Sequence, residues 1–544
     1  MVYAHDNDMR RLLSSPCYAV FSVDKAADRN RLVGLLKETE AWRLPLKQIV
    51  KQLCEEGDES GKLCKTVVLE TQYVDRDYAD AYSTLYGRTF HPYERLCYRL
   101  HFFSRSFDSM AYLDIESPER EKARLNRLQR EYQGFCVIRP SQPDTVGRAV
   151  FTPPKSKSKN KYLLCRDGYS LNLAGLPLEA QGCPFLEQDG MVGACATAAI
   201  WMAHMVLYKK RGLPTYSTTE ITEIADAGYP SPSRVFPSSG LTAEQVGVAL
   251  KRMGHETMLM ELDYASPRVA GEFLYRYLES GIPIVIGVAT LTGRHALTVI
   301  GHTLAPSSIE VPPMQELEID DGMLGIRYCS AAEWVDGWIV HDDQRGAYRQ
   351  ARLTTYRTAQ ATAVEMSDFP TRGETRKFPI KVAVVPLPRH VYLRPDEVEV
   401  KAAIVIALLK NIGALSPDFD GDGIVLRTLL MESNEFKASF DTAKRLTSRQ
   451  LGQEYRRMRL PRHVWVVEVS KVPLWNVPPA DKRVIGEIVL DPTSNPRQFG
   501  TIAVHIEERL WLTDPREQSM SGVMGDPVVL SDWTPNKCVS RKCT

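Results

Sequence analysis

Apolar and polar positions near the start of the chain follow two different periods. Between residues 29 and 53, apolar side chains such as Leu32 and Leu36 recur at the spacing of an amphipathic helix. Residues 66–70 and 135–139 are instead short runs of apolar and β-branched residues, bounded by polar residues or proline, which is typical of strands. The pattern predicts a mixed α/β region at the N-terminal end.

The same two periods return toward the C-terminal end. Pro395 opens a segment with helical spacing that stops at Gly413, which predicts a helix with proline in its first turn and glycine after its end. Three strand-like runs follow, at residues 464–469, 485–490 and 501–506. This pattern predicts a second α/β region.

The length of the chain requires more than one domain. A chain of 544 residues is too long for a single hydrophobic core, so two to four domains are expected. The stretch Pro153-Pro-Lys-Ser-Lys-Ser-Lys-Asn-Lys161 has the composition of a mobile linker, and the Pro-, Ser- and Gly-rich end of the chain that of a flexible tail. The predicted division is an N-terminal α/β region of unknown role, a linker, a core, a C-terminal α/β region and a tail, at residues 1–152, 153–162, 163–370, 371–515 and 516–544.

The core contains a cysteine at the predicted start of a helix. From Cys195 onward the chain is rich in alanine, with apolar residues at helical spacing, and a loop with Gly190 and Gly193 precedes it. In a first helical turn, free N–H groups and the helix dipole stabilise a thiolate. The side-chain amide of Gln188 could fold back and form an oxyanion hole with the backbone N–H of Cys195. A cysteine that is simply buried at a helix start is the alternative.

A histidine and two acids follow in the order that a nucleophilic cysteine needs. Residues 281–287 form a predicted buried strand, and His295 opens the next strand after a short turn. A third strand follows an irregular insertion and ends in Asp342 and Asp343, just before Gly346. A thiolate–imidazolium pair with an acid that orients the imidazole is the generalised catalytic triad.

Residues 180–350 resemble the papain-like cysteine peptidases, most closely the bacterial branch that includes the bacteriocin-processing peptidases. Four segments carry the resemblance, in the family's order: Gln188 with Gly193-Ala-Cys195, Gly240-Leu-Thr-Ala-Glu-Gln-Val leading to Gly254, Gly281-Ile-Pro-Ile-Val with His295-Ala-Leu-Thr-Val-Ile-Gly301, and Val340–Gly346. The resemblance implies an α+β fold with a papain-like core. In such a core a helical lobe carries the cysteine and an antiparallel sheet carries the histidine and the aspartate, here with additional α/β regions on both sides.

The resemblance also implies the chemistry of a cysteine peptidase or isopeptidase. Cys195 would attack an acyl carbon to form a thioacyl-enzyme, and His295 would then activate water to release it. The implied substrate is a protein or peptide, and no cofactor or metal is required. Enzymes on this broad fold also transfer acyl groups or deamidate glutamine, and an idle core would serve as a protein-binding module, so these alternatives stay open.

The two adjacent acids are expected to play different roles. Successive side chains of a strand alternate faces, so only one of Asp342 and Asp343 is expected to point at His295. The Asp-Pro-x-x-Gly turn of the bacterial branch aligns with Asp342, whereas the Asn-Ser-Trp-Gly of papain aligns with Asp343. We favour Asp342 as the orienting acid and keep Asp343 as the alternative. The other acid is expected to cap the turn toward Gly346.

The other histidines near the site are assigned structural roles. His302 lies seven residues after His295 on the predicted strand, an odd offset that places it on the opposite face. His204 lies nine residues after Cys195, about half a turn round the predicted helix. His341 alternates with the acid that follows it and is expected to point away from the site.

A second acidic segment imitates part of a calcium loop. Asp418-Phe-Asp-Gly-Asp-Gly423 matches the first half of the motif, but the twelfth position is Leu429 where a bidentate acid is required. A turn rich in Asp and Gly explains the segment without an ion. No metal site is predicted.

Bulk composition narrows the class of function. The formal net charge of +1 gives no sign of a nucleic-acid or membrane partner. Eleven scattered cysteines without a CxxC pair argue against a disulfide framework or a four-cysteine zinc site and favour a reducing compartment. Residues 1–15 lack the apolar run of a signal peptide, and no stretch reaches the roughly 20 apolar residues of a membrane span. The sequence predicts a cytoplasmic enzyme.

Overall fold

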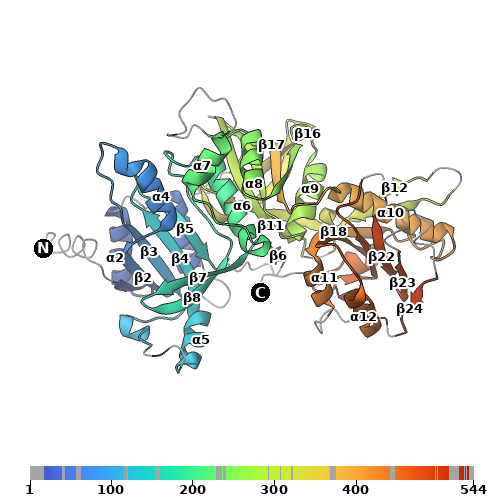
Figure 1. The fold of residues 1–544 in the computed structure, drawn as a ribbon, viewed down its shortest axis with the longest axis horizontal. Helices are drawn as coiled ribbons and strands as arrows, with labels where there is room; N and C mark the ends of the chain where they lie inside the picture. Colours follow the sequence, from blue (N-terminus) through green and yellow to red (C-terminus); the bar gives the residue numbers. More distant parts are fainter. Residues whose placement is uncertain are drawn as a thin grey trace.

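The structure is a computed structural model, and it describes most of the chain. The described residues are 18–38, 43–56, 63–115, 117, 120–141, 143–153, 160–227, 236, 240–291, 293–306, 308–319, 323–367, 375–440, 448–495, 498, 500–513, 526–531, 533 and 536–537. Most of the predicted linker and of the predicted tail lies outside the described residues. Figure 1 shows three sheet-containing regions side by side in chain order, from blue at the left to red at the right.

A five-stranded antiparallel sheet with strands in chain order forms the first region. Its strands are β1 (Tyr18–Ser22), β2 (Thr66–Tyr73), β3 (Cys97–Phe103), β4 (Tyr132–Arg139) and β5 (Thr145–Phe151), and its helices are α2 (Ala26–Glu38), α3 (Leu44–Val50), α4 (Arg76–Thr84) and α5 (Lys122–Glu131). The single helix predicted over residues 29–53 is wrong. Pro45 lies in the first turn of α3, where proline's missing N–H is harmless, so a second helix begins there.

Six antiparallel strands of the central region close into a barrel. The strands are β10 (Ile284–Thr290), β11 (Gly293–Leu304), β14 (Val335–Asp342), β15 (Gly346–Tyr356), β16 (Thr358–Ser367) and β17 (Thr375–Leu387). β17 closes the barrel because its first part pairs with β16 and its later part with β10. The short strand β6 (Lys161–Tyr162) adds to β11, and β9 (Glu256–Glu261) adds to β17. The hairpin of β7 (Asp167–Leu173) and β8 (Leu176–Gly182) lies between β6 and the other strands of this region in the sequence.

Four helices accompany the barrel: α6 (Cys195–Arg211), α7 (Thr218–Asp226), α8 (Ala243–Arg252) and α9 (Pro267–Glu279) (Figure 1). α6 packs against β11, and every residue from 196 to 207 is buried, which explains why the helix is apolar on all faces. It ends at Gly212, whose φ of 65° is the left-handed conformation that glycine adopts most readily. The nucleophile candidate therefore stands at the start of a rigid, central helix.

An eight-stranded sheet forms the third region, in the order β12-β13-β18-β19-β21-β22-β23-β24. These strands are β12 (Gln315–Leu317), β13 (Ile326–Ser330), β18 (Ile424–Glu432), β19 (His463–Lys471), β21 (Gly486–Leu490), β22 (Thr501–Ile506), β23 (Arg509–Leu512) and β24 (Val528–Val529). Its helices are α10 (Pro395–Asn411), α11 (Ser433–Ser439), α12 (Arg449–Arg457) and α13 (Val472–Trp475). α10 begins at Pro395 and is followed by Gly413 at φ 73°, as the sequence predicts.

The insertion between β11 and β14 is not irregular, contrary to the sequence-based expectation. It contains β12 and β13, and β13 pairs in parallel with β18 of the C-terminal sheet. Gln315–Leu317 and Ile326–Ser330 therefore belong to the third sheet, although the chain before and after them forms barrel strands. These strands are three and five residues long, too short to show a clear period in the sequence.

Buried ion pairs fix the C-terminal sheet to the barrel region through α9. Arg276 of α9 pairs with Glu399 of α10 at 2.9 Å between Nε and Oε2. Glu279 of α9 accepts a hydrogen bond of 2.8 Å from Nε of Arg427 on β18. All four side chains are buried, so each charge has its partner in the interior, where a lone charge would be costly.

The described residues form a mixed α/β fold with largely antiparallel sheets, which agrees with the broad class that the sequence predicts. The closed barrel is not predicted from the sequence. Part of the predicted tail is ordered into strands, because β24 joins the third sheet and β25 (Asn536–Lys537) pairs with β20 (Arg483–Val484). Among the described helices, none has both the length and the apolar character needed to cross a bilayer.

Candidate active site

Cys195 is the first residue of α6. Its side chain is partly exposed, whereas the other described cysteines are buried. The preceding residue, Ala194, occupies the N-cap position without a side chain that could accept a hydrogen bond. The first-turn N–H groups of α6 therefore lack an N-cap acceptor, which leaves the positive end of the helix dipole to act on the thiol.

The loop before α6 is shaped by Asp189, a residue that the sequence analysis missed. Oδ1 of Asp189 accepts hydrogen bonds from the N–H groups of Met191, Val192 and Gly193, at 3.0, 2.9 and 2.9 Å. The Asp-Gly pair at its start is a recognisable turn signal, since Asp bonds to backbone groups a few residues further on. The Asp189 carboxylate thus fixes the backbone of residues 191–193, directly before Cys195.

The N-terminal sheet also positions this loop directly. Ala149 of β5 exchanges two backbone hydrogen bonds with Phe185, at 2.9 and 2.8 Å. The N–H of Glu187 then donates to the carbonyl of Val146, and the guanidinium of Arg139 on β4 donates to the carbonyl of Glu187 at 2.6 Å. Residues just upstream of the nucleophile therefore form an extra edge on the N-terminal sheet. The sequence alone predicts no chemical role for this region.

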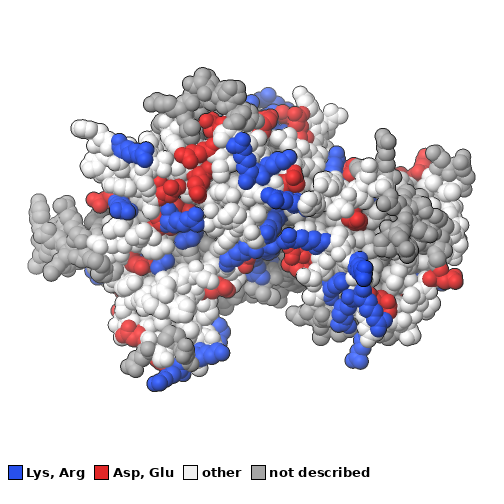
Figure 2. All heavy atoms as spheres, viewed as in Figure 1, with Lys and Arg blue, Asp and Glu red and all other residues white. Residues whose placement is uncertain are grey.

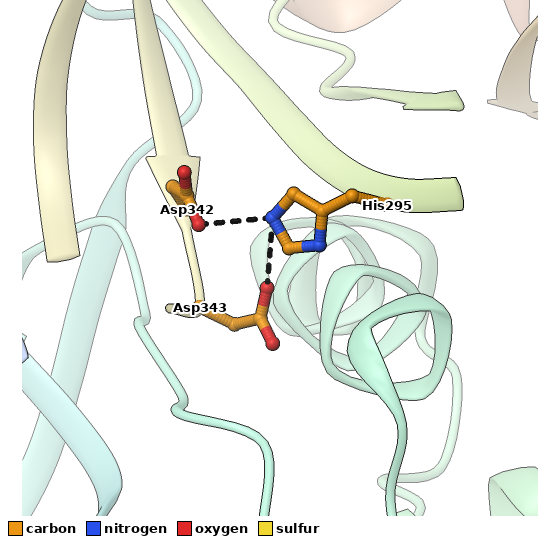
Figure 3. Close-up of side chains that lie close together, drawn as sticks. All are labelled: His295, Asp342 and Asp343. Carbon is orange, nitrogen blue, oxygen red and sulfur yellow. Dashed lines mark hydrogen bonds and ion pairs between the residues drawn. The ribbon is translucent and has the colours of Figure 1, made fainter. Parts of the chain in front are cut away.

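His295 lies on β11 with both acids on one side of its ring. Nε2 of His295 is 3.0 Å from Oδ1 of Asp342 and 3.6 Å from Oδ1 of Asp343. Figure 3 shows both carboxylates facing this nitrogen and the second ring nitrogen turned away from them. The expectation that only one acid faces His295 is wrong. The strand register shifts after Val340 and β14 ends at Asp342, so the alternation of faces does not extend to Asp343.

The turn is capped by Asp342 and not by Asp343. Oδ1 of Asp342 accepts hydrogen bonds from the N–H groups of Gln344 and Arg345 at 3.0 and 3.2 Å, and Oδ2 accepts one from the Arg345 side chain at 3.1 Å. The two Asp343 oxygens are fully buried and accept no hydrogen bond from the described residues. The prediction that the second acid caps the turn is therefore wrong. Asp342 both orients His295 and caps the turn, and Asp343 contributes mainly charge.

These contacts fix the protonation states of the three buried groups. Burial lowers the pKa of His295, but hydrogen bonding with Asp342 and Cys195 and the charges of both acids outweigh it and raise the pKa to about 10. Burial raises the pKa of Asp342, yet the His295 hydrogen bond and the charges of His295 and Arg345 bring it below its usual range. Burial, with the charges of Asp342 and Glu187, outweighs the charge of His295 and raises the pKa of Asp343 to about 7. His295 is thus an imidazolium at neutral pH.

The Cys195 thiol lies close to the His295 ring. Nδ1 of His295 has no fully formed hydrogen bond with the described residues, although the Cys195 thiol is close enough to help raise the pKa of the ring. In resting active sites, hydrogen bonds between the nucleophile and its base are often long or poorly aligned, and they tighten when substrate binds. The arrangement places a proton donor between a part-exposed sulfur and a buried carboxylate.

Gln188 lies at the base of the nucleophile loop with a partly exposed side chain. Among the described residues, none forms a hydrogen bond that holds its amide in place. Its role in an oxyanion hole therefore stays a prediction. The backbone N–H groups at the start of α6 are the donors that the fold itself provides.

His295, Asp342 and Asp343 also have the donor atoms of a metal site. One ligand atom from each lies within 4.8 Å of the others, and all three residues are buried. One imidazole and two carboxylates suit a divalent transition metal. An ion bound there would compete for the Nε2 atom that Asp342 holds at 3.0 Å, so metal binding and the imidazolium state exclude each other.

Three further histidines lie in structural contacts. Nε2 of His302 pairs with Glu279 at 2.5 Å, and Nδ1 of His204 lies 2.9 Å from Nε2 of His255. His341 is buried between the rings of Phe185 and Tyr348. None of these contacts is with Cys195 or with the two acids.

The segment that imitates a calcium loop is a turn before β18. Oδ1 of Asp420 is 2.5 Å from the ammonium of Lys410, and its Oδ2 accepts a hydrogen bond from the N–H of Arg327 at 2.9 Å. The N–H of Gly423 donates to the carbonyl of Asp420, which closes the turn. A protein cation therefore already pairs with the central acid of the motif.

Comparisons with protein-family models and with curated proteins find no match to this chain. What the site can do is therefore argued from its geometry and charge.

Proposed function

We propose that this protein is a papain-like, cysteine-dependent hydrolase that cleaves amide bonds in a protein or peptide. The observation that carries the proposal is the geometry around His295, whose Nε2 lies 3.0 Å from Asp342 and 3.6 Å from Asp343, near the part-exposed Cys195 that begins α6. A thiolate–imidazolium pair oriented by a third group is the arrangement that activates a cysteine nucleophile.

In the proposed mechanism the Cys195 thiolate attacks the carbonyl carbon of the scissile bond. The oxyanion that forms accepts hydrogen bonds from N–H groups at the start of α6, with Gln188 as a candidate second donor. His295 gives its Nδ1 proton to the leaving amine, because Nε2 stays bonded to Asp342. The products of this half-reaction are a free amine, a thioacyl-enzyme and a neutral imidazole.

The second half-reaction restores the site. Neutral His295 takes a proton from water at Nδ1, and the resulting hydroxide attacks the thioester carbon. The Cys195 thiolate leaves, the carboxylic acid departs, and the imidazolium is regenerated. Asp342 remains ionised throughout, since its role is to hold the tautomer and to stabilise the imidazolium.

The N-terminal region belongs to this machinery in the proposal. Arg139 and the β5 edge hold the nucleophile loop, and Gln52 of the segment after α3 donates to the carbonyl of Ala347, next to the acid-bearing turn. Both the nucleophile loop and the acid turn therefore rest on the same region. A cleaved or separated N-terminal region is expected to abolish activity even though it supplies no reacting atom.

Three outcomes distinguish the proposal from its alternatives on the same residues. The full chain is incubated with a peptide library derived from a proteome digest, and products are mapped by mass spectrometry. New chain ends that require Cys195 support hydrolysis. Deamidated glutamine without new ends favours a deamidase, and peptides joined to an added amine favour acyl transfer.

Matched variants make the test decisive. Cys195→Ala is compared with Cys329→Ala, which alters a buried cysteine in the C-terminal sheet. Turnover that disappears only in Cys195→Ala supports the proposed nucleophile. The absence of any product with the wild-type chain, together with an unreactive Cys195, would leave a protein-binding module as the function.

A further inference from the structure

A second concentration of charge lies at the far end of α6 and surrounds a cavity of about 440 Å³. Its walls come from the end of α6, the turn after α8, the turn after β17, and the segments next to β19 and β21. The cavity thus lies where the barrel region meets the C-terminal sheet. Figure 2 shows blue basic side chains gathered over the middle of this face, between α6 and α11 of Figure 1.

The cavity is lined by cations and by no acid among the described residues. Three guanidinium groups, those of Arg211, Arg389 and Arg462, line it together with His390 and His463. Glu432, outside the lining, forms ion pairs with two of these residues. Its Oε1 lies 3.9 Å from Arg462 and 3.8 Å from His463, longer than a hydrogen bond.

Arg211 is held in place by neutral histidines and not by a carboxylate. Its Nη1 donates to Nδ1 of His255 at 2.6 Å, and Nε2 of His255 donates to Nδ1 of His204 at 2.9 Å. Nε2 of His204 in turn donates to the carbonyl of Pro214 at 2.8 Å. This order of donors requires uncharged imidazoles, so the charge of Arg211 is oriented but not neutralised.

Elsewhere the same chain compensates its buried guanidinium groups. Arg276 contacts the carboxylates of Glu272 and Glu399, and Arg427 those of Glu279 and Glu468. At the cavity the cations act on one another instead. Burial and the charge of Arg462 lower the pKa of Arg211, against the raising effect of Glu432. The described lining of the cavity contains no acid, which leaves positive charge that an anionic ligand would compensate.

Gly254 and His390 of the cavity lining have positive φ angles. Gly254 has a φ of 99°, and a Cβ there would lie 2.7 Å from the Leu213 side chain. His390 has a φ of 67°, a conformation that costs energy for a non-glycine residue and that is concentrated at functional sites. The N–H groups of Tyr392 and Leu393 both donate to the carbonyl of Pro492, which joins two walls of the cavity.

We propose that this cavity binds a small ligand that carries two or more phosphate groups. Its volume is that of a small-molecule site, and guanidinium groups bind phosphate oxygens through paired hydrogen bonds. Pro388, Pro461 and Pro492 offer apolar walls to the rest of such a ligand. A bound phosphate chain would join the barrel region to the C-terminal sheet. The proposal does not depend on the function proposed for Cys195.

The test measures binding of sodium tripolyphosphate to the full chain by calorimetry at constant ionic strength. We expect saturable binding at one site. Arg389→Gln and Arg462→Gln should each weaken it about tenfold or more, the effect of losing one charge-assisted contact. Arg457→Gln is the matched control, because Arg457 and Arg462 have side chains 73% and 71% exposed and Arg457 lies outside the cavity. It should bind as the wild type does.

Three results would overturn the proposal. The first is a wild-type chain that shows no saturable heat with tripolyphosphate. The second is equal binding of citrate at the same ionic strength, because the site would then select charge and not phosphate. The third is an Arg457→Gln variant that loses as much affinity as Arg462→Gln, because binding would then be spread over the surface. Circular dichroism of each variant verifies that it is folded.

Discussion

The two ends of α6 gather charge in opposite ways. At the first end, two buried acids lie at 3.0 and 3.6 Å from Nε2 of His295, near Cys195, so positive and negative groups lie side by side. At the other end, about 25 Å away along a 17-residue helix, guanidinium groups surround a cavity without a described acid in its lining. The comparison teaches that burial alone does not mark a site. At the Cys195 end, opposite charges within the chain interact with one another. At the cavity, the positive charges lack such partners in the described lining, and we infer that a ligand supplies them.

The two flanking regions divide in the same way between these ends. The N-terminal sheet holds the nucleophile loop through β5 and Arg139. The C-terminal sheet is joined to α9 by Arg276 and Arg427 and supplies walls of the cavity. A change at one end of α6 is therefore expected to leave the function of the other end intact.

The largest expected effect comes from removing the charge that orients His295. Asp342→Asn should lower turnover by about 10⁴-fold, the cost of losing such an acid from a triad, because the imidazole would then lose both its tautomer and its charge partner. The Asp343 carboxylate lies 0.6 Å farther from Nε2 of His295 than that of Asp342, so Asp343→Asn should lower turnover at most about tenfold. Turnover of both variants on the same peptide substrate measures the difference. Equal losses would show that the acids act as one unit and would break the assigned division of roles.

The next effect concerns the reactivity of the cysteines. Cys195 should alkylate faster than the buried cysteines, because it is partly exposed and stands beside an imidazolium at a helix start. Burial raises the pKa of Cys165 and of Cys329 to about 12, so both should react slowly at neutral pH. Brief iodoacetamide treatment followed by peptide mass spectrometry gives the order. Uniform labelling would remove the distinction between a catalytic and a structural thiol.

Most of the secondary structure near the site follows from residue patterns. The start of α6 at Cys195, the helix from Pro395 and the strands that carry His295 and Asp342 were all predicted from spacing and from proline and glycine signals. These signals are local, so a single sequence contains them.

What the sequence did not predict depends on contacts between distant segments. The support of the nucleophile loop by β5 joins residues 149 and 185, and the short strand β13 finds its partner in β18. The position of Asp343 depends on a register shift in β14, which no period reveals. The cavity at Arg211 is built from five separated segments, so no motif could mark it. Asp189 is the exception, because its Asp-Gly turn signal was present in the sequence.

A smaller effect is expected in the pH dependence of the reaction. The raised pKa of His295 means that the imidazolium is lost as the pH rises through about 10, so activity should fall over that range. Asp343→Asn removes one of the charges that raise this pKa and should move the alkaline limit of kcat/KM to lower pH by about one unit. A matched change of a distant buried acid, Glu399→Gln, should leave the limit in place. An unchanged limit in Asp343→Asn would show that Asp343 does not act on His295.

The smallest expected effect is on the stability of the fold. Its sign shows whether the ionised Asp343 carboxylate stabilises or destabilises the protein. The folded-state pKa of Asp343 is raised from 3.8 to about 7, so the contribution of this group to stability is fully present below pH 3.8 and is lost as the pH rises through 7. Above pH 7 the ionised carboxylate, which accepts no hydrogen bond from the described residues, costs stability.

Asp343→Asn should therefore raise Tm by about 2–4 °C at pH 8, the shift that one kcal/mol produces in a domain of 150–250 residues. At pH 5, where the native carboxyl is already neutral, the rise should be smaller. Thermal unfolding at both pH values, with Asp342→Asn as the opposite case, measures this. Asp342→Asn should lower Tm at pH 8, because Asp342 holds His295 and caps the turn. A loss of Tm in Asp343→Asn at pH 8 would mean that the second acid is compensated as fully as the first.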